Sequence, residues 1–308
     1  MQAIHSPLIL YVPGLLPKPP ADQHRDALGR SLIDGVRKAD ASVAEQIASD
    51  EHAFDIVAWT YDFYRTHRDY ELDRAAIEDL LRQVRATDRD IREATSWKRR
   101  ATSWLYHLGD RLPFLIPHLA NEKMEVHMAD LRRYNRDQNG IATHIREMLK
   151  LPLRAAWEAG RPVLLIGHSM GSVIAWDTLW ELCHVHGDAL VLDTLLTMGS
   201  PLGQNYVQSR IKGSDRQGAE RYPVNVRRWR NVAAVGDLTA IDPTLANDFA
   251  PMLKHGLVES IEDQPVFNFF RLEGELNVHA EYGYLANETL GGIVAEWWQA
   301  ATRYRDSA

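Results

Sequence analysis

Residues 163–176 place an apolar run directly before Gly-His-Ser-Met-Gly and a second apolar stretch directly after it. The first run, VLLI, is typical of a buried strand, and the second has helical spacing. A strand that turns so sharply into a helix forces the residue at the turn, here Ser169, into a strained backbone conformation. Gly167 and Gly171 have no Cβ atoms to collide where strand and helix approach each other. The spacing therefore predicts a serine hydroxyl exposed at the carboxyl end of a sheet.

Strand-like and helix-like stretches alternate on both sides of this turn. Such alternation is typical of an α/β fold with a mostly parallel sheet that is covered by helices on both faces. The strands are predicted at residues 7–12, 54–60, 163–166, 189–201, 227–237 and 265–274, and helices at 21–40 and 291–304.

Residues 63–157 interrupt the alternation, because their apolar residues recur at helical intervals only. We predict a helical insertion here, with residues 1–62 and 158–308 forming the α/β core. Pro113 and Pro117 should break the middle of the insertion, which makes it a candidate lid as well as a candidate scaffold. The aromatic and apolar residues that would either line an acyl pocket or pack as helical core are Trp97, Trp104, Tyr106, Phe114 and Leu115.

The GHSMGS motif and its flanking strand and helix resemble the α/β-hydrolase superfamily, in its lipase and esterase branch. The resemblance covers residues 5–62 and 158–308. It implies a nucleophile, an acid and a histidine in that order along the chain. The TMGSPLG segment resembles the strand and loop that often follow the nucleophile in lipase-like members, so Pro201 and Leu202 are candidates for substrate contact.

A nucleophilic serine needs an imidazole to take its proton and a carboxylate to orient that imidazole. His279 is the predicted base, because it lies in NVHAEYGY just beyond the strand-like FNFFRL. Asp237 is the predicted acid, because it directly follows the strand-like NVAAVG. The alternatives that chain order leaves open are His255 for the base, and Asp242 and Asp193 for the acid.

Two backbone amides should hold the oxyanion of the reaction. The amide of Met170, directly after the nucleophile, is the first. The second is expected in YVPGLLPKPP after the first strand, where Gly14 permits the bend and Leu15 is the candidate donor. Family members often have His-Gly where this chain has Pro13-Gly14, so the register of the second donor stays open.

Charge, cysteine content and hydropathy argue against several classes of partner and site. The 35 basic and 42 acidic residues give a net charge of −7 and are mixed along the chain, so nucleic acid is not an expected partner. A single cysteine, Cys183, excludes an intramolecular disulfide. No basic leader and no run of about 18 apolar residues is present, so a cytoplasmic protein without a transmembrane segment is expected. His184 and His186 suit a helix C-terminus better than a metal site.

Together these features predict serine-dependent hydrolysis of a carboxylic ester through an acyl-enzyme, without a cofactor or metal. The substrate would be a small-molecule or lipid-like ester with an apolar acyl or alcohol part. A thioesterase or acyltransferase would use the same groups. A non-catalytic binding or scaffold protein of the same fold is the alternative from another class.

Overall fold

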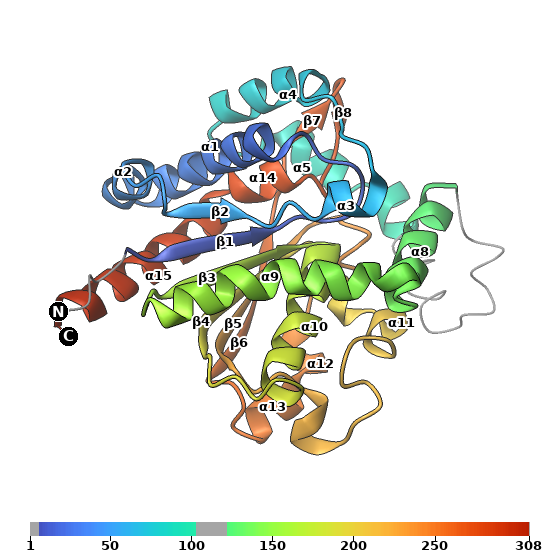
Figure 1. Ribbon diagram of the computed structural model, residues 1–308. Helices are drawn as coiled ribbons and strands as arrows, with labels where there is room; N and C mark the ends of the chain where they lie inside the picture. The colour runs from blue at the N-terminus through green and yellow to red at the C-terminus, as the bar shows by residue number, and fades with distance from the viewer. Residues whose placement is uncertain (1–5, 103–121, 308) are drawn as a thin grey trace.

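The computed structural model of the chain describes residues 6–102 and 122–307. Its centre is a six-stranded sheet in the order β2-β1-β3-β4-β5-β6, in which each neighbouring pair of strands is parallel. The predicted α/β class, with a mostly parallel sheet flanked by helices, is confirmed (Figure 1). The strands are β1 (Leu8–Val12), β2 (Phe54–Ile56), β3 (Val163–His168), β4 (Leu192–Met198), β5 (Val226–Ala234) and β6 (Ser260–Val266).

The described helices surround this sheet and form most of the remaining chain. Residues 97–102 are also helical. The α-helices are α1 (Ala21–Ala39), α2 (Ala41–Ala48), α3 (Thr60–Tyr64), α4 (Glu71–Arg82), α5 (Asp88–Ala94), α8 (Glu122–Asn135), α9 (Ile141–Glu158), α10 (Met170–His184), α11 (Asn205–Gln208), α12 (Leu245–Asp248), α13 (Ala250–Lys254), α14 (Glu281–Leu285) and α15 (Glu288–Ser307).

The sheet separates two apolar cores because side chains alternate across each strand. Leu8, Leu10 and Val12 of β1 pack with α9 and α10 on one face. Ile9 and Tyr11 pack with α1, α14 and α15 on the other face. Figure 1 shows α1 and α9 on opposite sides of β1. Both faces of β1 and β3 are therefore buried, which explains their apolar runs.

The strand order reverses at β1, and this reversal positions the site. The chain leaves β1 toward β2 on one side, and then crosses to β3 on the other side of β1. Loops that follow β1 and β3 at the carboxyl edge therefore diverge and leave a crevice, which is where open α/β sheets bind ligands. The loop with Leu15 follows β1, and Ser169 follows β3.

The last strand differs from the sequence prediction. The expected strand at 265–274 is replaced by β6 at Ser260–Val266 and by a short antiparallel hairpin of β7 (Arg271–Leu272) and β8 (Glu275–Leu276). As an edge strand, β6 tolerates polar residues and Pro265, which hide it from a search for apolar runs. Phe269 and Phe270 are instead buried in the loop that follows β6.

Helices between β2 and β3 occupy the region predicted as an insertion. Ile77 of α4 is buried with the core on the α1 side, and Leu149 of α9 with the core on the α10 side. Trp97 is 75% exposed. The division into a core and an insertion at 63–157 stays a prediction. The candidate residues Trp104, Tyr106, Phe114 and Leu115, and both prolines of that segment, lie outside the described residues.

Candidate active site

Ser169 lies at the sharp turn between β3 and α10, with φ 52° and ψ −123°. This conformation is rare for a residue with a side chain. The glycines around it are required by space: a Cβ on Gly171 would lie 2.0 Å from the carbonyl oxygen of Val12. A Cβ on Gly167 would lie 2.7 Å from Cα of Ser172. Both contacts are with backbone, so neither can be relieved by a side-chain rotation.

Hydrogen bonds hold the turn in place. The Ser169 amide donates to the carbonyl of Met198 at the end of β4 (3.0 Å). The Ser172 hydroxyl donates to the Ser169 carbonyl (2.6 Å) and shares a hydrogen bond with the Ser200 hydroxyl (2.7 Å). A Cβ on Gly14 would lie 2.9 Å from Cβ of Ser169, so the loop after β1 lies directly against the serine side chain.

His279 and Asp237 form a close pair, with 2.8 Å between His279 Nδ1 and Asp237 Oδ2. Tyr284 donates its hydroxyl to the same oxygen (2.7 Å), and the Thr239 amide donates to Oδ1 (2.8 Å). Burial alone would raise the pKa of Asp237, but His279 and these two donors hold that pKa below its usual value. Asp237 is therefore a buried carboxylate that stays ionised at neutral pH.

Different elements bring the pair to the serine. Asp237 follows β5 after a turn at Gly236, whose φ is 84°. His279 lies between β8 and α14. Ser169 and His279 line the same pocket. In the part of the chain that the structure describes, the side-chain partner of His279 Nε2 is the Thr239 hydroxyl (3.5 Å), and no hydrogen bond joins the side chains of Ser169 and His279. Such contacts are often long before substrate binds.

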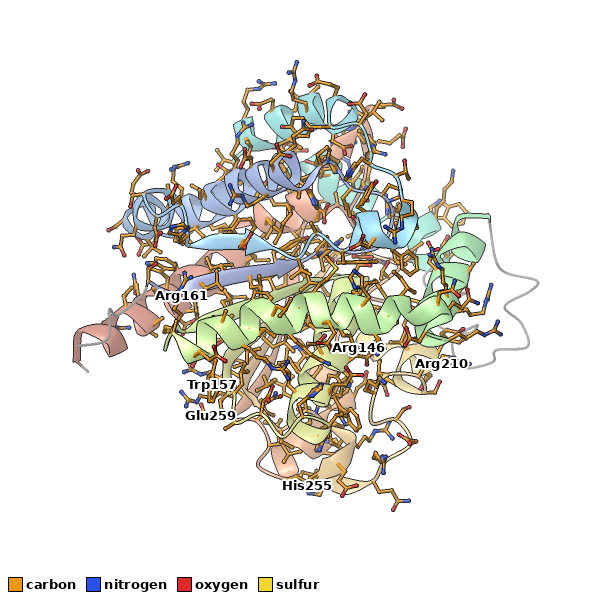
Figure 2. The ribbon with its side chains drawn as sticks, in the orientation of Figure 1. Arg146, Trp157, Arg161, Arg210, His255 and Glu259 are labelled. Carbon is orange, nitrogen blue, oxygen red and sulfur yellow. The ribbon has the colours of Figure 1, made fainter. Side chains whose placement is uncertain are left out.

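The structure does not bring the alternative residues to Ser169. His255 is exposed at the end of α13 (Figure 2). Asp242 accepts hydrogen bonds from the amide and hydroxyl of Thr244. Asp193 is near the start of β4 and pairs with Arg227 and Arg228. None of the three alternatives is among the described residues that line the pocket.

The pocket has a volume of about 1060 Å³. Leu15, Met170 and Pro201 line it, whereas Leu202 does not and is fully buried in the core on the α10 side. No described residue accepts a hydrogen bond from the Leu15 or Met170 amide. Both amides of the expected oxyanion site therefore border the pocket with donor capacity unused by the described chain.

Leu16 has a left-handed backbone, with φ 76°, and its side chain is 46% exposed. Its amide donates to the hydroxyl of Tyr64 (3.1 Å), which in turn donates to Asp130 of α8 (2.7 Å). Sequence reasoning missed Tyr64, because only the fold brings α3 beside the loop after β1. The positive φ of a leucine leaves no signal in the sequence.

A buried carboxylate, Glu281, lies behind the site and was also missed. It accepts hydrogen bonds from the Tyr11 hydroxyl and from Lys18 Nζ (2.9 Å each), and its Oε1 lies 2.9 Å from His24 Nε2. Burial would raise the pKa of Glu281, but Lys18 and His24 hold it well below the usual value. This network ties the loop of His279 to β1, to the loop after β1 and to α1.

His168, directly before the nucleophile, lies between that network and the histidine loop. Its Nε2 is 3.0 Å from the carbonyl oxygen of His279, and its Nδ1 is 3.7 Å from Glu281 Oε2. Burial, assisted by the nearby His279, lowers the pKa of His168 to about 3. His168 is therefore a neutral imidazole that can donate from Nε2 to the His279 carbonyl.

The two histidines considered for metal binding have other partners. His184 Nε2 lies 2.8 Å from the Tyr222 carbonyl oxygen, and His186 Nε2 lies 3.0 Å from Lys150 Nζ. The described residues contain no group of three or more histidine, cysteine or acidic side chains arranged to hold a metal ion. Among the described helices, none has the length and apolar character needed to cross a bilayer.

Comparison with known proteins gives one family. The sequence model of the alpha/beta hydrolase family matches residues 94–305, which is more than half of the chain and includes the serine turn and the histidine–aspartate pair. Neither the search of curated proteins nor the search of solved structures returns a significant match.

Proposed function

Because the chain belongs to the alpha/beta hydrolase family, we propose that it is a serine hydrolase that cleaves carboxylic esters through an acyl-enzyme. The substrate we propose is a small-molecule or lipid-like ester with an apolar part. The observation that carries the proposal is the strained Ser169 at the end of β3, in one pocket with the hydrogen-bonded pair of His279 and Asp237.

The proposed first half-reaction forms the acyl-enzyme. Ser169 Oγ attacks the ester carbonyl carbon while His279 Nε2 takes its proton, and His279 then gives that proton to the departing alcohol. Asp237 accepts from Nδ1 and stabilises the imidazolium. Its three described partners support this role, since they keep the carboxylate ionised and fix its direction.

The oxyanion that forms during attack would lie between the amides of Met170 and Leu15. The positive end of α10 lies on the same side, because Met170 is the first residue of that helix. In the second half-reaction, water attacks the acyl-enzyme with His279 as base, and the acid is released. Pro201, Val207, Ile241 and Phe270 supply apolar wall for the acyl or alcohol chain.

The test is covalent labelling by a fluorophosphonate probe together with hydrolysis of nitrophenyl esters. Ser169→Ala should abolish labelling and lower kcat/KM for the esters by about 10⁴-fold or more. The matched control is Ser209→Ala, because Ser209 is exposed and is not among the residues lining the pocket. Undiminished turnover by a folded Ser169→Ala variant would overturn the proposal.

The partner residues are tested in the same assay. His279→Ala should be nearly as damaging as Ser169→Ala, and Asp237→Asn should be severe but leave more residual rate. The paired controls are His255→Ala and Asp242→Asn, which change the same residue types outside the pocket. If a control were as damaging as its partner in a folded protein, the base or the acid would have to be reassigned.

A further inference from the structure

Arg99 lines the pocket of Ser169 but is far in sequence from every residue of the proposed mechanism. It lies in the helical stretch 97–102. Its Nη2 donates to the carbonyl oxygen of Leu276 (2.8 Å), and its Cδ lies 3.3 Å from where a Cβ on Gly236 would be. Gly236 immediately precedes Asp237, and Leu276 lies on the segment leading to His279. The side chain of Arg99 therefore contacts the segment that carries the proposed acid, Asp237, and the segment that leads to the proposed base, His279.

The other flexible cations of the pocket are paired. Lys18 Nζ is 2.9 Å from Glu281 Oε1, and Arg68 binds both carboxylate oxygens of Asp73 at 2.8 Å each. Within residues 6–102 and 122–307, Arg99 has no carboxylate partner, and its described acceptor is a neutral carbonyl.

The carboxylates among the described residues of the pocket do not pair with Arg99 either. Asp69 is the remaining carboxylate lining the pocket; it is exposed, and its Oδ1 accepts from the Glu71 amide. Arg99 is half-buried. A guanidinium has five N–H donors in a planar fork that matches a carboxylate, and a partly desolvated cation gains most from such a partner.

We propose that Arg99 binds a carboxylate carried by the substrate, so that the preferred esters are amphipathic: an apolar chain that ends in a carboxylate. This inference rests on the proposed ester hydrolysis. The pocket suits such a molecule, because apolar side chains such as Ile241 and Phe270 line it together with Arg99, and its volume of about 1060 Å³ leaves room for a chain.

The experiment compares nitrophenyl monoesters of glutarate, adipate and suberate with neutral nitrophenyl esters of equal chain length. The measured quantity is the ratio of kcat/KM for the charged ester to that for the neutral ester. At the best chain length this ratio should fall about tenfold or more in Arg99→Gln. It should also fall in wild type as salt is raised. The matched control is Arg100→Gln, since Arg100 is the exposed neighbour on the same helical stretch and does not line the pocket.

The inference would be overturned if the ratio of kcat/KM for charged and neutral esters in Arg99→Gln equalled the wild-type ratio at every chain length. A lower melting temperature with equal losses on charged and neutral esters would overturn it as well, because Arg99 would then be a brace between the segments of Gly236 and Leu276.

Binding without turnover separates this inference from the proposed function. Suberate monomethyl ester should bind Ser169→Ala in calorimetry, and Arg99→Gln in that background should weaken binding about tenfold. If this binding were found while the wild-type protein hydrolysed no ester and reacted with no fluorophosphonate, the proposed function would be refuted and the carboxylate site would stand.

Discussion

The hydroxyl of Tyr64 supports the loop that carries the proposed second oxyanion donor, and Tyr64→Phe removes that hydroxyl while keeping the ring. The hydroxyl accepts from the Leu16 amide, directly after Leu15, and donates to Asp130. A left-handed conformation costs a residue with a Cβ about 1–2 kcal/mol. A hydrogen bond of this kind returns about 1 kcal/mol net. Because the two energies are similar, the loop around Leu16 should lose its fixed conformation when the hydroxyl is removed.

The expected consequence is a fall in kcat of about five- to tenfold, since about 1.4 kcal/mol corresponds to a factor of ten. This is less than the ~10²–10³-fold loss that follows removal of an oxyanion donor itself, because the Leu15 amide remains. KM for a short neutral ester should change little, since the oxyanion forms only in the transition state. Fluorophosphonate labelling should slow by a similar factor.

A second substitution distinguishes loop strain from a general loss of packing. Glycine adopts positive φ about as readily as negative φ, so Leu16→Gly in the Tyr64→Phe background should recover most of the lost kcat. Tyr61→Phe is the matched control, because Tyr61 lies on the same helix and is exposed, stacked on His67. Wild-type kcat in Tyr64→Phe, or a loss that Leu16→Gly does not recover, would refute the reasoning.

Two further substitutions test the acid and the turn. Tyr284→Phe removes a donor to Asp237, so the depressed pKa of that carboxylate should rise and the acidic limb of the kcat profile should move to higher pH; an unmoved limb would contradict this. Because the pKa of Asp237 is depressed in the folded state, the ionised carboxylate stabilises the wild-type fold above about pH 4. This stability is lost as pH falls through the folded-state pKa. In acid unfolding, Tyr284→Phe should therefore lose stability at a higher pH than wild type. Gly171→Ala should prevent folding or lower the melting temperature severely, because its Cβ would lie 2.0 Å from the Val12 carbonyl oxygen; Gly187→Ala is a control for glycine loss in open space, although its φ of 68° adds some strain. A well-folded Gly171→Ala variant with normal labelling would mean that strand and helix do not need this close approach.

The strands β1 and β3 could be predicted because each is buried along its whole length and is therefore an apolar run in the sequence. The edge strand β6 could not, since it has one neighbouring strand and only Ile261 and Val266 of its seven residues are buried. The FNFF segment was wrongly predicted as a strand because it is apolar. Its phenylalanines Phe269 and Phe270 are buried, but they lie in a loop. Apolar content reports burial, and burial coincides with strand structure only in the middle of the sheet.

The candidate site divides in a similar way. The chain order that the family resemblance implies, together with the predicted strand ends, selected Ser169, His279 and Asp237, whose catalytic roles stay predictions. The residues that hold them could not be found, because their partners are remote in sequence: Tyr11 and Glu281 are 270 positions apart, and Arg99 meets Leu276 across 177. No local spacing encodes such contacts, and a single sequence offers no other signal for them.

Several residues beside the pocket have positive φ, and those that carry side chains explain why the site depends on remote residues. Ser169 and Leu16 both have positive φ, as do Gly236 before Asp237 and Gly199 after β4. At Gly199 a Cβ would lie 3.0 Å from Asp237 Oδ2 and 3.1 Å from His279 Nδ1, so this glycine makes room for the pair.

Each strained residue with a side chain needs a partner that holds it there. Ser172 and β4 hold Ser169, and Tyr64 holds Leu16. The motif indicates the strained turn at Ser169 but not the one at Leu16, and at both positions the fold supplies the hydrogen bonds that make the strain tolerable. Removing the hydroxyl of Ser172 or Tyr64 should therefore reduce the rate of the chemical step before it unfolds the protein, because these hydroxyls hold the turn and the loop while the apolar packing of the two cores remains.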